Sequence, residues 1–203
     1  MKHPITVVFF GKSGAGKGTQ ATLLLKSFER LDAARPTIYV ETGQKFRNFV
    51  STSPSYMAKR IYEVIHAGKF LPPFIPIWMW TQFFVDEIKT GEEHMVFDGV
   101  CRQPEEGPIL DSALQFLGRI KPVVILLDVH HDEVTKRLLK RGRHDDTHEK
   151  IASRLAAFEK EGMPSVTYFK TSPHVKFVTV NGDQPIEKVH EDVLAAIGIE
   201  GRL

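Results

Sequence analysis

The sequence predicts an α/β fold in three layers, with a mainly parallel five-stranded sheet and helices on both of its faces. Short β-branched and aromatic runs alternate along the chain with longer segments in which apolar residues recur at helical spacing. The run at 123–129 is apolar throughout, as expected for a strand that is covered on both faces of a parallel sheet. A chain of 203 residues can bury a core of its own, so we expect residues 1–203 to form one domain.

Each element follows from its local pattern. The first strand, Ile5–Phe10, is β-branched and aromatic and stops at Gly11, and a helix with an apolar face follows over Thr19–Arg30. The region Gln44–Ala67 has a helical pattern that breaks before Pro54, because proline disfavours helix in the residue before it, so we expect two short helices. The other expected strands are 37–40, 95–97, 123–129 and 175–180, and the other expected helices are 74–88, 132–140, 147–160 and 185–197.

Composition and charge argue against several classes of protein. Lys and Arg number 27 against 25 Asp and Glu, a formal net charge of +2, whereas a protein that coats nucleic acid carries a clear basic surplus. The single cysteine, Cys101, excludes an intrachain disulfide framework and a multi-cysteine zinc site. The apolar run at 5–10 is too short for a signal peptide or a membrane span. We therefore expect a cytoplasmic protein with no membrane or nucleic-acid partner and no zinc.

A glycine-rich segment directly follows the first strand and opens the first helix. Residues 11–19 read Gly-Lys-Ser-Gly-Ala-Gly-Lys-Gly-Thr, which has the P-loop spacing of a glycine, four residues and Gly-Lys. Glycines let backbone N–H groups approach phosphate oxygens, the helix N-terminus adds partial positive charge, and Lys17 adds a full one. Gly18 takes the usual Ser/Thr position, and Thr19 comes one residue later. The segment predicts a P-loop NTPase-like fold that binds a nucleoside triphosphate.

The segment Gly-Ala-Gly-Lys-Gly-Thr-Gln at 14–20 also resembles the adenylate kinases and their nucleoside monophosphate kinase relatives, and the likeness continues in order along nearly the whole chain. Thr-Gly-Gln-Lys-Phe-Arg at 42–47 is similar to the family's Thr-Gly-Asp-x-x-Arg. The resemblance implies a helical flap over 42–71 that binds the monophosphate, with Thr42 near its base and Arg47 on its phosphate. Residues 67–71 are similar to the segment whose backbone lines the base pocket.

Two further motifs continue the resemblance. Asp-Gly-Val-Cys-Arg at 98–102 is similar to the family's Asp-Gly-Phe-Pro-Arg, which implies that Asp98 holds Mg²⁺ through water and that Arg102 bridges the acceptor phosphate. The run at 137–146 resembles the family's lid, followed by an arginine on the next helix. In that resemblance Arg137 packs on the donor base, and the later arginines surround the transferred phosphoryl group. The loop at 181–184 is similar to the one that meets the adenine of ATP.

The resemblance thus implies four sets of residues. The implied catalytic residues are Lys17, Asp98, Arg102, Arg141, Arg143 and Arg154. The implied ATP site comprises Gly14, Ala15, Gly16, Lys17, Gly18, Thr19, Arg137, Arg141 and Gln184. The implied AMP site comprises Thr42, Arg47, Lys69, Phe70, Leu71, Gly99, Arg102, Glu106, Arg143 and Arg154. The implied magnesium ligands, acting through water, are Thr19 and Asp98.

The sequence departs from the family pattern at several places; Gln44 and Asn181 each replace an aspartate without an evident consequence, and three other departures bear on the chemistry. The lid, at 141–147, is very short, so we expect either that it closes less completely over ATP or that a neighbouring subunit of an oligomer helps to close it. Otherwise we expect a monomer. Cys101 stands where the pattern has proline, which leaves either a trans turn or a costly non-proline cis bond. Glu106 stands where the pattern has glutamine; when ionised it accepts from the amino group of adenine or cytosine but cannot donate.

A metal site on a helix is the alternative reading of the lid. His144 and His148 lie four residues apart, with two aspartates between them. In the family resemblance an aspartate at this place orients the lid arginines instead, and we favour that interpretation.

The expected function is reversible phosphoryl transfer from Mg·ATP to AMP, giving two ADP. Such transfer needs in-line placement and positive charge around the moving group, but no covalent intermediate. Arginine suits this role because its planar fork binds phosphate oxygens in pairs and stays protonated. The alternatives are a CMP/UMP-type or broad-specificity monophosphate kinase and, in another class, a catalytically weak ATP-binding regulatory protein. The many arginines favour an enzyme, because a binding module needs only the loop and Lys17.

Overall fold

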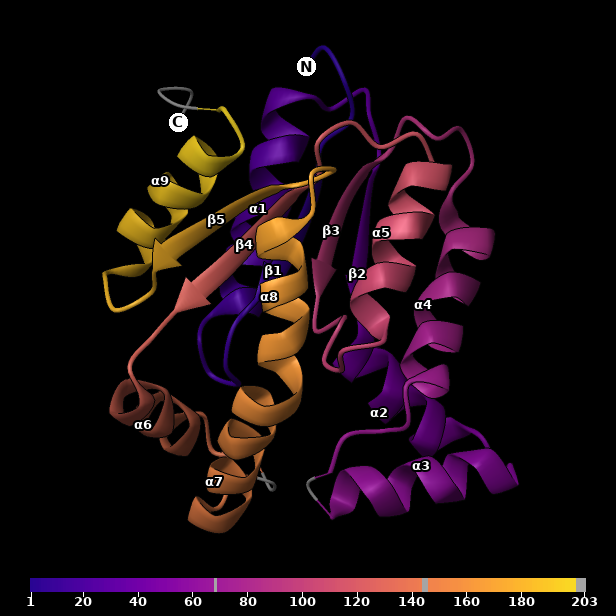
Figure 1. The fold of residues 1–203 in the computed structure, drawn as a ribbon, viewed down its shortest axis with the longest axis vertical. Helices are drawn as coiled ribbons and strands as arrows, with labels where there is room; N and C mark the ends of the chain where they lie inside the picture. The colour runs from indigo at the N-terminus through magenta and orange to yellow at the C-terminus, as the bar shows by residue number, and fades with distance from the viewer. Residues whose placement is uncertain (68, 144–145, 200–203) are drawn as a thin grey trace.

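The computed structural model describes residues 1–67, 69–143 and 146–199, and a five-stranded sheet forms its centre (Figure 1). The described strands pair in the order β2-β3-β1-β4-β5, and each of these pairings is parallel. The predicted α/β class is thereby confirmed. The strands are β1 (Thr6–Phe10), β2 (Thr37–Glu41), β3 (His94–Asp98), β4 (Val123–Asp128) and β5 (Lys176–Asn181).

Strand β1 lies in the middle of the sheet because its β-branched and aromatic side chains can be buried on both faces. Val7 and Phe9 pack into the core on one face, while Val8 and Phe10 pack into the core on the other. In register, Val8 is level with Phe97 of β3. The strand therefore joins the two halves of the hydrophobic core, and the loop that follows it lies at the centre of the sheet's carboxyl edge.

Helices cover both faces of the sheet. Apolar side chains of α1 and α9 join the core on one face, and those of α4, α5 and α8 join the core on the other. Two more pairs, α2–α3 and α6–α7, lie beyond the end of the sheet toward which the strand arrows point (Figure 1). The helices are α1 (Lys17–Leu31), α2 (Thr42–Thr52), α3 (Tyr56–His66), α4 (Phe74–Glu87), α5 (Glu106–Phe116), α6 (His131–Arg141), α7 (His148–Ala157), α8 (Met163–Thr171) and α9 (Ile186–Ala196).

The α2–α3 pair has a small core of its own. Phe46 of α2, Ile61 of α3 and Ile75 of α4 pack together with Leu71, apart from the two cores of the sheet. The chain enters this pair directly from β2, since α2 begins at the residue after the strand. The pair is therefore attached to the main body through few elements, as expected for a segment inserted into the α/β domain.

Most predicted elements are present, but two helices were missed. The predicted break before Pro54 is confirmed, because α2 ends at Thr52 and Ser55 caps α3 by accepting from the N–H of Ala58 at 3.1 Å. Helix α5 was not predicted because its first turn contains a glycine and a proline. Helix α8 was also missed, because the predicted helix 147–160 continues through a π-helical turn, Phe158–Gly162, into it.

Three residues of the predicted flap and lid lie outside the described ranges, namely Gly68, His144 and Asp145. The alternative histidine pair is thus described only at His148, the first residue of α7. No helix among the described residues combines the length and the apolar composition that a membrane crossing requires.

The buried position of β3 leads to a stability prediction. Phe97 is fully buried and packs edge-on against Phe84 of α4, with ring centroids 5.7 Å apart. We expect Phe97→Ala to lower the free energy of unfolding by about 3–5 kcal/mol, through lost burial and the cavity left behind. The same change at Phe116, which is 90% exposed, should cost less than about 0.5 kcal/mol. Urea denaturation of the two variants measures both, and equal losses would contradict this description of the core.

Candidate active site

The loop between β1 and α1 is built around glycines. Gly14 has a φ of +87°, and a Cβ added there would lie 2.8 Å from Cγ of Leu138 in α6. Both the backbone conformation and the packing therefore exclude a side chain, so α6 lies directly against the loop. Gly16, the N-cap of α1, also has a positive φ of +97° and provides no side-chain cap. The first N–H groups of α1 thus point to where an anion can bind.

Lys17 is the first residue of α1 and the central cation of the loop. Its Nζ donates to two carbonyl oxygens of the loop, at 2.8 and 3.0 Å. Burial lowers the pKa of Lys17 to about 8; Asp98 opposes this shift, whereas Arg102 and Arg141 add to it. The three cations repel one another, and a bound anion would relieve that repulsion.

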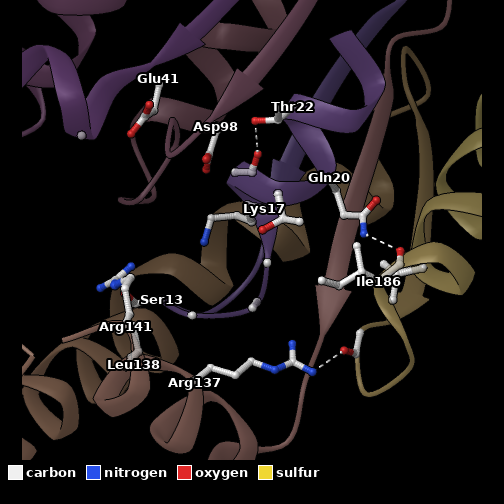
Figure 2. Close-up of a pocket in the computed structure, with 18 of the residues that line it drawn as sticks. Ser13, Lys17, Gln20, Thr22, Glu41, Asp98, Arg137, Leu138, Arg141 and Ile186 are labelled. Carbon is white, nitrogen blue, oxygen red and sulfur yellow. Dashed lines mark hydrogen bonds between the residues drawn. The ribbon is translucent and has the colours of Figure 1, made fainter. Parts of the chain in front are cut away.

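A cleft of about 810 Å³ lies over the loop. Figure 2 shows Lys17, Asp98 and Arg141 turned toward the same side of this cleft from the loop, the end of β3 and the end of α6. Farther along, Arg137 donates to the carbonyl oxygen of Gly182 at 3.0 Å (Figure 2). The cleft is lined by each residue of the implied ATP site, namely Gly14, Ala15, Gly16, Lys17, Gly18, Thr19, Arg137, Arg141 and Gln184.

The implied magnesium ligands fit such an ion. Asp98 and Thr19 both line the first cleft, and a Cβ added to Gly18 would lie 3.3 Å from Oδ2 of Asp98, so this carboxylate faces the first turn of α1. Tyr39 donates to the same oxygen at 3.5 Å. Within the described ranges, no cluster of three or more His, Cys, Asp or Glu side chains could enclose a metal. A carboxylate and a hydroxyl suit Mg²⁺, which keeps several waters and takes its other ligands from phosphates.

A second cavity of about 650 Å³ lies beside the first, between the α2–α3 pair and α7. Its lining is more apolar and includes Phe46, Val50 and Ile65, as expected of a pocket for a flat ring with a few polar anchors. The cavity is lined by each residue of the implied AMP site, namely Thr42, Arg47, Lys69, Phe70, Leu71, Gly99, Arg102, Glu106, Arg143 and Arg154.

Arg47 and Arg102 meet between two glycines. A Cβ added to Gly43 would lie 3.3 Å from Nη1 of Arg47 and 3.7 Å from Nη2 of Arg102. At Gly99, where φ is +80°, a Cβ would lie 2.5 Å from Nη2 of Arg102, so only glycine leaves room for this guanidinium. The carbonyl oxygen of Gly99 accepts from Nε of Arg102 at 2.8 Å and from the hydroxyl of Thr42 at 2.6 Å. Two like charges held this close define a site for an anion.

The lid arginines are held by one buried carboxylate. Asp146 accepts two hydrogen bonds from Arg141, at 2.8 and 2.9 Å, and one from Arg154 at 2.7 Å. It also accepts from the backbone N–H of Arg143 at 3.3 Å. Burial opposes ionisation, but the hydrogen bonds from Arg141 and Arg154 outweigh it and lower the pKa of Asp146 to about 2. A carboxylate at this place therefore orients the lid arginines, as the resemblance implied.

The turn after β3 contains Cys101 and leads into Glu106, the first residue of α5, and both residues depart from the family pattern. The described peptide bonds include no cis bond, and Cys101 adopts a φ of +53°, so the turn is trans and left-handed at this residue. Glu106 is 1% exposed and lines the second cavity, but its oxygens accept three backbone N–H groups of the turn. The sequence interpretation of Glu106 as a base contact did not anticipate these bonds.

Several lining residues were missed by the sequence interpretation. Tyr39 and Glu41 face the first cleft from the end of β2, and Gln103 lines the second cavity. Because side chains alternate along a strand, Tyr39 and Glu41 lie on the same face, next to the Thr-Gly motif. This alternation could have predicted from the sequence that both side chains face the site. Glu41 accepts from Arg47 at 3.3 Å. No local pattern distinguished Gln103 from its neighbours.

The two cavities share part of their lining. The residues that line both are Ser13, Lys17, Gly43, Arg47, Arg102, Arg141 and Arg143. Four of these seven are arginines and one is a lysine, so positive charge is concentrated where the cavities meet. The positions of the groups would allow two phosphate chains to approach each other end to end.

A parallel sheet with a glycine loop after its first strand and with cations gathered at its carboxyl edge defines a P-loop nucleotide-binding protein. The family model described as "Adenylate kinase" matches residues 9–174. The chain therefore belongs to the adenylate kinase family of nucleoside monophosphate kinases, which are phosphotransferases.

Relatives named for different activities match along nearly the whole chain. Adenylate kinase 1 of Nostoc sp. is 30% identical over 198 residues, which cover 95% of this chain and 98% of the relative. The adenylate kinase of Corynebacterium aurimucosum is 31% identical over 193 residues, with coverage of 94% and 98%. The uridylate kinase of Saccharomyces cerevisiae is 29% identical over 200 residues, with coverage of 95% and 91%. Family membership therefore leaves the acceptor base open.

The lowered pKa of Lys17 predicts a pH dependence of nucleotide binding. In the free protein Lys17 loses its proton as pH rises through about 8, and a neutral amine attracts phosphate less than an ammonium does. The Kd for ATP should therefore be flat from pH 7 to 8 and then rise by up to about tenfold per pH unit, the limit for linkage to one proton. Isothermal titration calorimetry measures this. The Lys17→Met variant should bind ATP more weakly, and its Kd should not rise with pH above 8. A wild-type Kd that stays constant above pH 8 would contradict the role of Lys17 in binding phosphate.

Proposed function

We propose that the chain is an adenylate kinase that transfers the terminal phosphoryl group of Mg·ATP to AMP. A new bond forms between a phosphate oxygen of AMP and the γ-phosphorus of ATP, while the bond from that phosphorus to the oxygen of the β-phosphate breaks. Two ADP result, and the reaction is reversible. The proposal rests mainly on one observation, the five cationic side chains that line both cavities.

In this proposal ATP occupies the first cleft, with its phosphates on the loop. The N–H groups at the start of α1 and the amine of Lys17 bind the phosphates, and Arg137, beside the loop that holds Gln184, packs on the donor base. Asp98 and Thr19 hold Mg²⁺ through water. When bound, Mg²⁺ supplies positive charge to the phosphate oxygens and aligns them.

AMP occupies the second cavity. Its phosphate lies between Arg47 and Arg102, and its base lies in the apolar part of the cavity near Thr42. Arg141, Arg143 and Arg154 stabilise the charge that spreads over the transferred group in the transition state, and Asp146 holds two of their side chains in place. Because these groups need no reorganisation during the reaction, they act by preorganised electrostatics.

The flap and the lid are proposed to close over the nucleotides. The flap, residues 42–71, packs on Ile75 of α4 through a small core that is separate from the two cores of the sheet, which allows it to move relative to the sheet. The lid, residues 141–147, joins α6 to α7, and its described part is fixed by Asp146. Closure excludes water, which would otherwise take the place of AMP as acceptor. We propose that the enzyme works as a single domain and as a monomer.

AMP is the preferred acceptor in this proposal because of Thr42 and because two of the relatives above are named adenylate kinases. The likeness to a uridylate kinase makes a CMP/UMP-type or broad-specificity enzyme the nearest alternative. Glu106 gives no support to either choice, since its oxygens are bonded to the backbone. A regulatory ATP-binding protein remains the alternative from another class.

An acceptor panel tests the proposal. With ATP and Mg²⁺ held constant, ADP formation is measured by a coupled assay with AMP, CMP, UMP and GMP. We expect the highest kcat/KM with AMP. A higher value with CMP or UMP would assign the chain to the alternative kinase, and no transfer to any acceptor, with ATP still bound, would indicate the regulatory protein.

A single substitution tests the role of Arg102. Arg102→Ala removes a guanidinium that lines both cavities, and we expect kcat to fall by about 10²- to 10⁵-fold while the Kd for ATP changes little. Arg60→Ala serves as the matched control, because Arg60 pairs with Glu63 on the exposed side of α3. Equal losses of transfer and of ATP binding in Arg102→Ala would show that this residue is misassigned.

A further inference from the structure

We propose that Glu106 is a positioning residue for phosphoryl transfer: it holds the backbone turn that carries Arg102, and its carboxylate is matched to the N–H group of Cys101. The inference rests on the proposed function, because it assigns Arg102 to the acceptor phosphate. It changes the role of Glu106 from recognition of the acceptor base to organisation of the phosphate site.

The geometry of the turn carries this inference. Oε2 of Glu106 accepts from the N–H of Cys101 at 3.0 Å, and Oε1 accepts from the N–H groups of Arg102 at 3.0 Å and of Gln103 at 3.2 Å. Three successive N–H groups thus converge on one carboxylate, which is 1% exposed. The backbone of Arg102 lies in the middle of this set, so its position depends directly on Glu106.

The same turn connects the acceptor cavity to the rest of the molecule. The side-chain amide of Gln103 donates to the carbonyl oxygen of Leu71, at the end of the flap. The carbonyl oxygen of Gln103 accepts from the hydroxyl of Ser165 in α8 at 2.6 Å. Nε of Arg102 is held by Gly99 at 2.8 Å. Arg102 is therefore held by hydrogen bonds at both its backbone and its side chain, and Glu106 accepts the bond from the backbone.

The residue types at 101 and 106 are coupled by their hydrogen-bonding capacity. An amide in place of the Glu106 carboxylate keeps one acceptor oxygen but presents an NH₂ group in place of the other, so it cannot accept both sets of N–H groups. The N–H of Cys101 would then face another donor. A proline at 101 has no N–H group, so it would leave nothing for the second carboxylate oxygen to accept. Its ring also fixes φ near about −65°, which is incompatible with the left-handed conformation of Cys101. The N–H group at 101 and the carboxylate at 106 are thus matched to each other in this turn.

Glu106→Gln tests the positioning role directly. We expect kcat to fall by about tenfold, the effect of one buried N–H group left without an acceptor, and kcat/KM to fall by the same factor for AMP and for CMP. The Kd for ATP should stay within about twofold, since the first cleft is untouched. A loss for only one acceptor would show that Glu106 contacts the base. Lower thermal stability with unchanged kcat would show that it merely caps α5. Either result overturns the inference.

Substitutions at Cys101 test the match between this residue and Glu106. Cys101→Pro removes the N–H group and cannot adopt the left-handed φ of +53°, so it should reduce kcat by about tenfold or more, both alone and together with Glu106→Gln. Cys101→Ala keeps the backbone N–H and removes only the thiol, so it should retain kcat within about twofold. A Cys101→Pro variant with unchanged kcat overturns the match. If Cys101→Pro does not fold, the acceptor comparison with Glu106→Gln still decides the positioning role.

The wild-type protein separates this inference from the proposed function. Transfer by the wild type to none of the four acceptors would refute the proposed function itself. Transfer by the wild type together with an unchanged kcat in Glu106→Gln would refute only the positioning role of Glu106.

Discussion

Positive charge gathered at the carboxyl edge of the sheet is the constraint on which the site depends. Burial lowers the pKa of both Lys17 and Arg102. Arg102 further lowers the pKa of Lys17, and Arg47 further lowers the pKa of Arg102. Asp98 offsets only part of this cost. The protein keeps the cations in place by bonding them to carbonyl oxygens, those of the loop for Lys17 and that of Gly99 for Arg102. A bound polyanion supplies the missing negative charge, and this need connects the fold to its ligands.

The strand order explains why segments far apart in the chain meet at this place. Because β3 pairs with β1, the turn that carries Arg102 lies next to the phosphate loop. Because β4 pairs with β1 on its other side, α6 begins on the opposite flank of that loop. The α2–α3 pair follows β2, which pairs with β3, so Arg47 approaches from the side of the second cavity. The position of each of these cations thus follows from the order of the parallel strands.

Two buried carboxylates organise the arginines in different ways. Asp146 binds guanidinium groups directly and fixes side chains of the lid and of α7. Glu106 binds backbone N–H groups and fixes the path of the chain that carries Arg102. In each case the carboxylate is buried and its hydrogen-bonding capacity is used, which makes the arrangement specific.

The sequence by itself determined the strands, the phosphate loop and the two-helix flap, because these depend on local periodicity, on glycine spacing and on the effect of Pro54 on its neighbour. Through a family resemblance it also pointed to many of the residues that line the two cavities, but not to Tyr39, Glu41 or Gln103. It missed α5 and α8, whose first turns contain helix-breaking residues that tertiary packing tolerates.

Only the tertiary structure decided what Glu106 does. A carboxylate at that position can accept hydrogen bonds from a nucleotide base or from the backbone. The residue type is the same in both cases, so the sequence does not distinguish them. The left-handed conformation of Cys101 turns three N–H groups toward it, and buried N–H groups must find acceptors. That demand arises from the path of the chain in three dimensions, which no local pattern of residues encodes.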